Sequence, residues 1–246
     1  GTGGTATPNL SSGALVLNAA ATSAGSNIAC TFTNTKLPTV TLTKISNGDV
    51  GAFTFTGTNG WTSQTVTTLT SGTGETGATQ TLTAAATATT ISEAIPAGYV
   101  LASATCTGLG AGGTAVPNLA TGALVLDGIA TAAGSNIACT FTNTKRPTIT
   151  LTKVSNGGVG AFNFSGDNGF GAVQTITTAV SGTGVTGAPR TLTAAAAATT
   201  ITESIPAGYS LASATCTGMG TGGTATPNLA SGALVLDSAA TAAGSA

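Results

Sequence analysis

The amino-acid sequence predicts an all-β protein built from tandem antiparallel β-sandwich domains. Segments in which apolar residues alternate with Thr or Ser recur along the chain, separated by Gly, Asn and Pro. Alternation with a period of two indicates strands that bury one face, and the separating residues indicate turns. The segment Gly1–Leu10 recurs at 110–119 and 220–229, so the chain repeats with a period of 109–110 residues. A period of this length is the size of one small β-sandwich.

Within one period, the alternating segments predict about seven short strands. They lie at 14–17, 28–34, 40–44, 53–55, around 66, 89–95 and 100–106. The pairs Asn47-Gly48 and Asn59-Gly60 are typical of tight turns, because both residue types tolerate positive φ. The alanine runs at 84–86 and 194–198 are too short to form stable helices.

Domain boundaries are expected at the two prolines of Lys-Leu-Pro at 36–38 and Lys-Arg-Pro at 145–147. Proline cannot donate to a strand ladder and therefore starts or ends strands. Residues 1–35 are then the C-terminal strands of a partial sandwich, 36–145 a complete sandwich, and 146–246 a sandwich that lacks its last strand.

The composition excludes several classes of function. The chain of 246 residues has 6 Lys and Arg, 7 Asp and Glu and no His, with a net charge of −1. Nucleic-acid binding needs a run of basic residues, and the chain has none. Its longest apolar runs are far below the roughly 18 residues of a membrane span. We also expect no metal site, no cofactor and no enzymatic activity, because the chain has no His, no CxxC motif and no acidic cluster.

Only 5% of the residues are charged, against about 25% in ordinary globular proteins. Like-charge repulsion is what keeps neighbouring protein molecules apart, and this surface provides little of it. The composition therefore suits a protein that packs against copies of itself.

The four cysteines fall into two equivalent pairs. Cys139 follows Cys30 by 109 residues, and Cys216 follows Cys106 by 110. Only Cys106 and Cys139 belong to the same predicted domain, where they lie at the ends of neighbouring late strands. They are expected to form a disulfide, with buried free thiols as the alternative.

Cys30 and Cys216 have no mate within their own domains, and their partners are expected outside this chain. Two explanations stay open. The chain is a window on a longer repetitive polypeptide, or residues 28–35 of one copy complete the last domain of the next and pair Cys30 with Cys216. Against the second explanation, residues 1–27 and 220–246 encode the same segment, so one copy would be redundant at each junction.

Three polar residues of the complete domain lie in phase with apolar neighbours and are expected to point inward: Lys44, Glu93 and Asn143. Lys44 and Glu93 recur as Lys153 and Glu203. Burying an amine, a carboxyl group and an amide in one sandwich is costly unless they meet.

Three motifs carry a family resemblance: Leu-Thr-Lys at 42–44, Glu-x-Ile-Pro-Ala-Gly-Tyr at 93–99 and Cys-Thr-Phe-Thr-Asn-Thr at 139–144. They resemble the prealbumin-like domains, of SpaA type or collagen-adhesin B type, of bacterial surface proteins. The resemblance implies an Ig-like or prealbumin-like sandwich and an extracellular, cell-surface location. Members of this family serve as stalks, pilin-like backbones and adhesin spacers.

The resemblance also implies an internal isopeptide bond between Lys44 and Asn143, with Glu93 as the proton shuttle. The sequence departs from the isopeptide-forming relatives in one respect. Glu93 lies one position closer to the Pro-x-Gly-Tyr turn, which puts its direction in doubt. In the alternative reading, Lys44 extends to the domain rim and Asn143 caps a strand end.

We therefore expect a structural subunit or repeat segment of a bacterial extracellular fibre, filament or surface stalk, with copies of itself as partners. An adhesin that binds a host or surface ligand is the alternative. Near-identical tandem domains favour the structural role, because a dedicated binding domain usually differs from its spacers.

Overall fold

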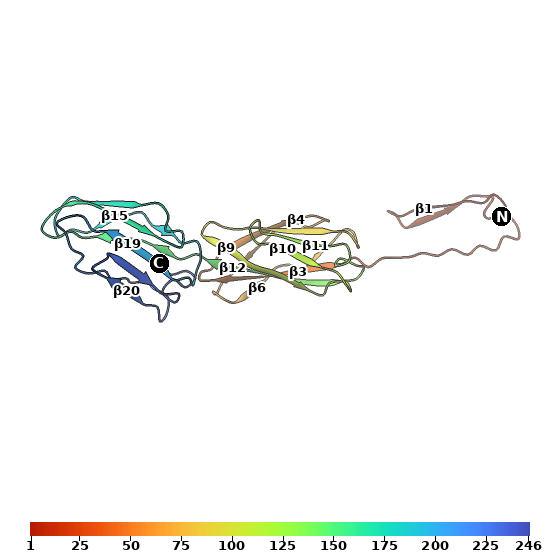
Figure 1. Ribbon diagram of the computed structural model, residues 1–246. Coiled ribbons are helices and arrows are strands. Elements are labelled where there is room, and N and C mark those ends of the chain that lie inside the picture. The colour runs from red at the N-terminus through yellow and green to blue at the C-terminus, as the bar shows by residue number, and fades with distance from the viewer. The chain divides into compact units, whose positions relative to one another are not determined.

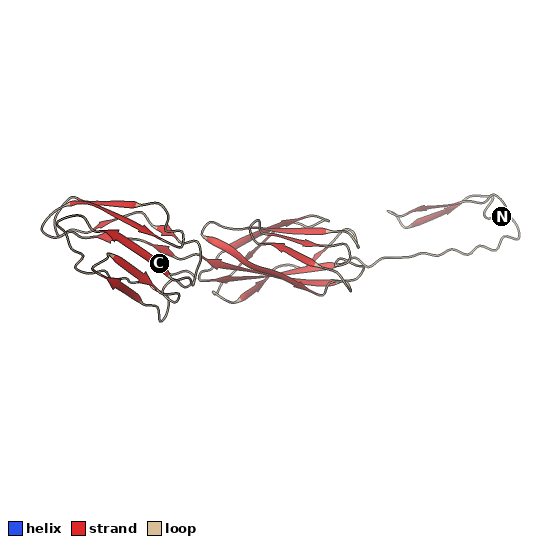
Figure 2. Ribbon diagram, in the orientation of Figure 1, coloured by secondary structure: helices blue, strands red, loops and turns tan.

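The computed structural model describes all residues from 1 to 246, and the chain is all-β as predicted (Figure 2). No helix long and apolar enough to cross a membrane is present. Residues 1–35 and residues 36–246 form two separate compact units.

The first unit contains a single hairpin of β1 (Ala6–Asn9) and β2 (Ala14–Leu17), and these two strands pair only with each other. The strand expected at 28–34 does not form, and residues 27–38 have no regular secondary structure. The reason is the lack of a partner, because a strand needs a neighbour to satisfy its backbone groups. Ile28 and Phe32 are accordingly 43% and 68% exposed.

Residues 36–145 form a sandwich of two five-stranded sheets (Figure 1). The first sheet has the order β10-β11-β8-β4-β5, and the second has the order β6-β3-β12-β9 with β7 also paired to β3. The strands are β3 (Thr39–Asn47), β4 (Ala52–Gly57), β5 (Gln64–Thr67), β6 (Gly74–Thr76), β7 (Gln80–Thr81), β8 (Thr89–Ala94), β9 (Tyr99–Thr107), β10 (Ala115–Asn118), β11 (Ala123–Leu126) and β12 (Asn136–Lys145).

The first and last strands of this sandwich lie side by side. β12 pairs antiparallel with β9 on one side and parallel with β3 on the other. All other pairings are antiparallel, so this one parallel ladder is the exception to the antiparallel arrangement that the sequence predicted. β12 is therefore the central strand that closes the second sheet.

The core of the first sandwich comes from the alternating apolar residues of both sheets. Its largest members include Phe53, Phe55 and Phe141, which are 0% exposed, and Trp61, which is 8% exposed. Each such side chain stabilises the fold by about 1.5–3 kcal/mol relative to an exposed one. The turn before Trp61 has Asn59 and Gly60 at φ 55° and 81°, as expected for a tight Asn-Gly hairpin turn.

Residues 146–246 repeat the first sheet but only part of the second. The complete sheet has the order β16-β15-β19-β21-β20, and two isolated pairs, β13-β18 and β14-β17, remain of the other. The strands are β13 (Thr148–Ile149), β14 (Thr152–Lys153), β15 (Gly160–Gly166), β16 (Gln174–Thr178), β17 (Val185–Thr186), β18 (Arg190–Thr191), β19 (Thr199–Ser204), β20 (Ala225–Asn228) and β21 (Ala233–Leu236). Residues 209–217, the counterpart of β9, form no strand. The missing element is the counterpart of β12, to which both neighbours would bond.

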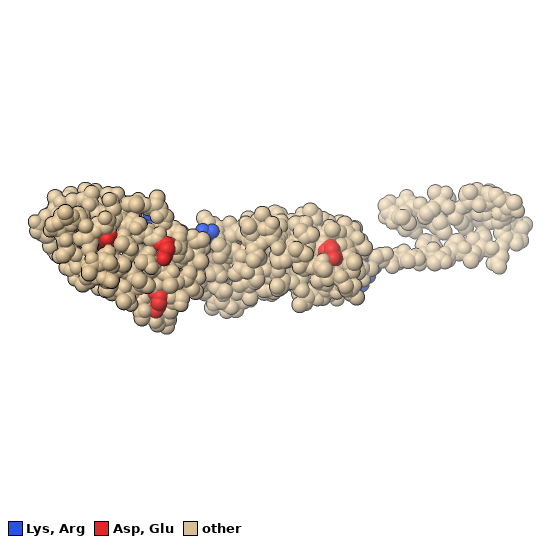
Figure 3. All heavy atoms as spheres, viewed as in Figure 1, with Lys and Arg blue, Asp and Glu red and all other residues tan.

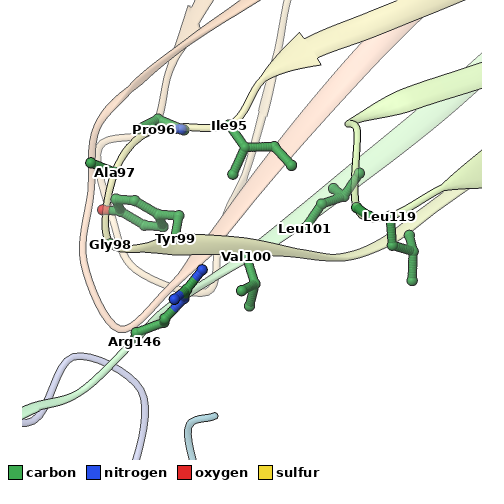
Figure 4. Close-up of a pocket in the computed structure, with 10 residues that line it drawn as sticks. Ile95, Pro96, Ala97, Gly98, Tyr99, Val100, Leu101, Leu119 and Arg146 are labelled. Carbon is green, nitrogen blue, oxygen red and sulfur yellow. The ribbon is translucent and has the colours of Figure 1, made fainter. Parts of the chain in front are cut away.

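The two sandwiches meet at a short joint. The backbone N–H of Arg146 donates to Gly98 O (2.8 Å), and that of Gly244 donates to Lys145 O (3.2 Å). Arg146 lies beside Gly98 and Val100 at the edge of a shallow cavity of about 350 Å³ (Figure 4). Charged side chains are sparse on the face shown in Figure 3, and one of the few ion pairs, between Lys145 and Asp49 (3.4 Å), lies at this joint.

Candidate functional site

Lys44 points into the first sandwich from β3. The burial of β3 alternates along its length, and Lys44 shares the inward face with Val40 and Leu42. Its side chain is 0% exposed, so the alternative in which it extends to the domain rim is wrong. A buried ammonium group is costly unless partners compensate it.

Several groups surround the amine of Lys44. Its Nζ donates to Glu93 Oε2 (3.3 Å) and to the backbone oxygen of Phe141 (3.4 Å). The ring of Phe53 lies 4.4 Å from Nζ, measured to the ring centroid. A cation over an aromatic face gains about 2 kcal/mol or more when it is desolvated. The carboxylate, the carbonyl and the ring together compensate part of the cost of burying the charge.

The Glu93 carboxyl group lies between the amine and an amide. Glu93 is on β8, in the facing sheet, and is 3% exposed. Its Oε1 accepts a hydrogen bond from Nδ2 of Asn143 and lies 3.3 Å from Nζ of Lys44. The structure therefore brings the three predicted residues together, and the shorter spacing from Glu93 to the turn does not aim its side chain away.

Asn143 reaches this position from β12. Phe141 is the register partner of Lys44, so Asn143 follows two residues further along the neighbouring parallel strand. A register shift between Thr142 and Asn143 marks a bulge against β9. Asn143 is 0% exposed, and its Oδ1 is buried without a hydrogen-bond partner. A buried acceptor without a partner costs about 1–3 kcal/mol, so this amide is held in an unfavourable state.

Burial shifts both titratable groups of the cluster toward their neutral forms. Desolvation lowers the pKa of Lys44 to about 8, although the charge of Glu93 opposes the shift. Desolvation raises the pKa of Glu93, opposed by Lys44 and by the hydrogen bond from Asn143. A neutral amine is a nucleophile and a protonated carboxyl group is a proton donor. The cluster thus has the parts that amide formation between lysine and asparagine requires.

The disulfide is the second constraint on β12. Cys106 on β9 and Cys139 on β12 are register partners, and they form a disulfide with a Cα–Cα distance of 4.1 Å. It closes a loop with a sequence separation of 33 residues. On the chain-entropy argument, such a loop stabilises the fold by about 3.7 kcal/mol. No group of three or more metal-ligating side chains is present.

Comparison with known proteins identifies the fold family. A family model described as a prealbumin-like fold domain, of SpaA type, matches residues 40–145 and again residues 149–246. The chain belongs to the prealbumin-like fold domain family. Searches of curated proteins and of solved structures found no match. The family assignment bears out the resemblance, which rested on three short motifs at 42–44, 93–99 and 139–144.

The second prealbumin-like domain contains only part of the same cluster. Lys153 Nζ lies 2.7 Å from Glu203 Oε1 and 4.4 Å from the centroid of the Phe162 ring. The counterpart of Asn143 by sequence is Asn34, which is exposed in the first unit. The side chains of Lys153 and Glu203 are 13% and 6% exposed, whereas both are 0% in the first domain.

The two remaining cysteines are free thiols. Cys30 is exposed, and Cys216 is partly buried. Burial raises the pKa of the Cys216 thiol. Cys216 packs against the core of the second prealbumin-like domain, as Cys106 does in the first.

Sequence reasoning missed the aromatic ring under each lysine amine. Phe53 and Phe162 stand 109 residues apart, the same offset as Lys44 and Lys153. This shared offset was a usable signal, because a repeated lysine and a repeated phenylalanine on adjacent inward faces can meet. The backbone oxygen of Phe141 gave no signal, because it depends on the parallel pairing of β3 with β12.

Proposed function

We propose that this protein is a structural segment of a bacterial extracellular fibre or surface stalk, in which each prealbumin-like domain is held closed by covalent cross-links. The observation that carries the proposal is the pairing of the first strand with the last. β3 and β12 run parallel and adjacent, and the cluster of Lys44, Glu93 and Asn143 bridges them.

This strand arrangement resists tension along the chain. Force enters the complete domain at the start of β3 and leaves at the end of β12. Because the strands are parallel neighbours, pulling on these two ends slides one strand along the other and loads the hydrogen bonds of the ladder together. The ladder joins residues 39–47 to residues 136–144. A hairpin pulled from its open end would instead lose its bonds one after another.

A bond from Lys44 Nζ to Asn143 Cγ would strengthen this path further. The neutral amine attacks the amide carbon, the new amide forms, and one ammonia leaves. Glu93 contacts both groups, so it can take the proton from the amine and deliver it to the leaving nitrogen. Tension would then pass from β3 into β12 through the side chains and bypass the core.

Other features support the structural role. Few residues separate the end of β12 at Lys145 from the start of β13 at Thr148, and the backbone bonds of the joint hold the two domains against each other. The low charge favours close packing of copies. Prealbumin-like domains of SpaA type are structural modules of surface proteins, and the family match covers both repeats.

Intact mass spectrometry tests the cross-link. After reduction of the Cys106–Cys139 disulfide, we expect the wild-type chain to be lighter than its sequence by one ammonia from Lys44 and Asn143. Glu93→Gln removes the proton shuttle and should restore the full mass. Asp127→Asn makes the corresponding change at an exposed turn after β11 and should leave the mass loss intact. A wild-type chain of full mass would end the isopeptide proposal.

Single-molecule stretching tests the mechanical role. A closed bond shields the 99 residues between positions 44 and 143 (143 − 44), which would otherwise extend by about 330–360 Å. The intact disulfide keeps 33 of these residues from extending. On unfolding, the Glu93→Gln chain should therefore extend by about 220 Å more than the wild-type chain. Reduction should release the rest. An equal extension of wild type and Glu93→Gln would contradict the mechanical role.

Antibody labelling of native material tests the assignment to a fibre. We expect regular filaments or stalks that carry the label along their length. Label confined to dispersed molecules that bind a glycan or protein ligand would instead favour the adhesin.

A further inference from the structure

The second prealbumin-like domain contains a groove of about 1040 Å³. Its lining includes residues 147–156, residues 208–219 and the inward side chains Phe162, Phe164 and Glu203. The two flanking segments are the counterparts of β3 and β9, between which β12 lies in the first domain. The groove therefore has the position, the neighbours and the apolar floor of a missing strand.

The same chain contains a second copy of that strand sequence. Residues 27–36 are identical to the ten residues of β12 at 136–145. At 27–36 the apolar side chains have no core to pack against: Phe32 is 68% exposed, whereas its counterpart Phe141 is 0% exposed. The apolar face of a strand is thus present without a sheet, and an open sheet is present without its central strand.

We propose that residues 27–36 of one copy insert as a strand into the groove of the second domain of another copy. The inference rests on the proposed function, because it names the joint by which copies form the fibre. The donor strand runs parallel to residues 148–156 and antiparallel to residues 209–217, as β12 does between β3 and β9.

The register of β12 assigns a partner to each unmatched group. Cys30 takes the place of Cys139 and faces Cys216, as Cys139 faces Cys106. Phe32 packs edge-on against Phe164, as Phe141 does against Phe55. Asn34 reaches the Lys153–Glu203 pair and completes the second cluster.

The donor's own second domain cannot be the acceptor. β3 and β12 start at the same end of the first sandwich, where Gly134 N–H donates to Lys36 O (2.9 Å). Residues 27–36, the tail, leave the first sandwich from that end, whereas the second domain follows from the opposite end, beyond Lys145. A ten-residue tail reaches at most about 33–36 Å, roughly the length of β12 itself. If this segment turned back along the first sandwich, it would end before it reached the groove. Its chain direction would also oppose the direction that a strand in the groove requires.

The ends of the two domains also fit such a joint. A Cβ added to Gly48 would collide with Ala243 of the following domain, whereas a Cβ added to its counterpart Gly157 would meet no atom within 4 Å. The counterpart of Ala243 is Ala133. In the proposed joint, Gly157 of the acceptor therefore faces Ala133 in the first domain of the next copy. The acceptor already holds β20 and β21, so the donor's equivalent β1-β2 hairpin stays outside the groove. This hairpin pairs with no other strand, which leaves it free to do so.

Closing the Cys30–Cys216 bond is an oxidation. Two thiols become one disulfide, and a disulfide-bearing oxidant accepts the two electrons and two protons by thiol exchange. Oxidised glutathione supplies this chemistry in a test with the purified full chain.

The experiment follows disulfide-linked species on non-reducing gels and maps them by mass spectrometry. Wild type should form a ladder whose links join Cys30 to Cys216. Cys30→Ser alone and Cys216→Ser alone should stay monomeric, and their equimolar mixture should stop at dimers. Phe32→Asp should reduce the ladder at least ten-fold. Leu10→Asp, which places the same charge at another exposed apolar position of the first unit, should leave it within two-fold.

Several results would overturn the proposal. These are a wild-type chain that stays monomeric, symmetric Cys30–Cys30 or Cys216–Cys216 links, and native material in which one continuous polypeptide fills the groove without a Cys30–Cys216 link. Electron microscopy separates this joint from the fibre function. Closed rings with the Cys30–Cys216 link would refute the fibre function and support the joint. Native fibres without this link would support the fibre function and refute the joint.

Discussion

Titration of Lys44 should leave a distinct signature in the stability of the first domain when the isopeptide bond is open. Its pKa falls from 10.5 to about 8 on folding. Between these values the unfolded chain binds the proton and the folded chain does not, so the free energy of unfolding rises with pH. The difference between the two pKa values, 10.5 − 8, at about 1.36 kcal/mol per pH unit, amounts to about 3 kcal/mol.

Urea unfolding of Asn143→Ala, which cannot close the bond, measures this rise. Trp61 is the only tryptophan and lies in the core of the first domain, so its fluorescence reports that domain alone. We expect stability to increase by about 3 kcal/mol between pH 8 and 10.5. Wild type with the bond closed should show no such rise, because an amide nitrogen does not titrate there.

The control is Lys44→Met in the Asn143→Ala background, which removes the amine but keeps the other titrating groups. If Asn143→Ala showed no more rise than this control, Lys44 would not be the buried base that the structure describes. Glu93 contributes in the opposite direction at lower pH. Its raised pKa means that stability falls as the pH rises from its ordinary value of 4.5 toward the folded value.

Three further predictions concern the disulfide, the joint and the core. Replacing Cys106 and Cys139 with alanine should lower the unfolding free energy by about 3.7 kcal/mol in urea melts, and an unchanged midpoint would contradict the loop-entropy argument. Gly48→Ala should expose the joint to trypsin more than Gly157→Ala in the monomeric chain, because both positions have positive φ but only the first lacks space for a Cβ. Phe53→Ala should cost about 3–5 kcal/mol, and a loss below about 1 kcal/mol would show that the ring does not fill the core.

The alternation of residues predicted which side chains face the core, and it did so for the cluster as well as for apolar positions. Lys44, Glu93 and Asn143 each kept the phase of their strand, and all three are buried. This succeeded because the side-chain direction in a strand is a local property with a period of two. The size of each domain was predicted from the 109–110-residue period of the sequence.

Strand pairing could not be predicted at the same level. Alternation is the same in parallel and antiparallel strands, so nothing local in β3 or β12 encodes that they run parallel. The clearest case is the ten-residue sequence that occurs twice. At 136–145 it is a central strand, and at 27–36 it forms no strand. The sequence is the same in both places, and only the presence of neighbouring strands differs.

The second domain shows what this central strand contributes. Equivalent side chains are more exposed in the second domain than in the first. Phe164 is 8% exposed and Phe55 0%, and the side chain of Lys153 is 13% exposed and that of Lys44 0%. The counterparts of β3 and β9 also lose most of their ladder. The facing sheet keeps its strand order, because it does not depend on the missing strand. Under the proposed joint, residues 27–36 of another copy would complete the sheet, bury the lysine cluster and join the copies in one step. Assembly would then be the final stage of domain folding.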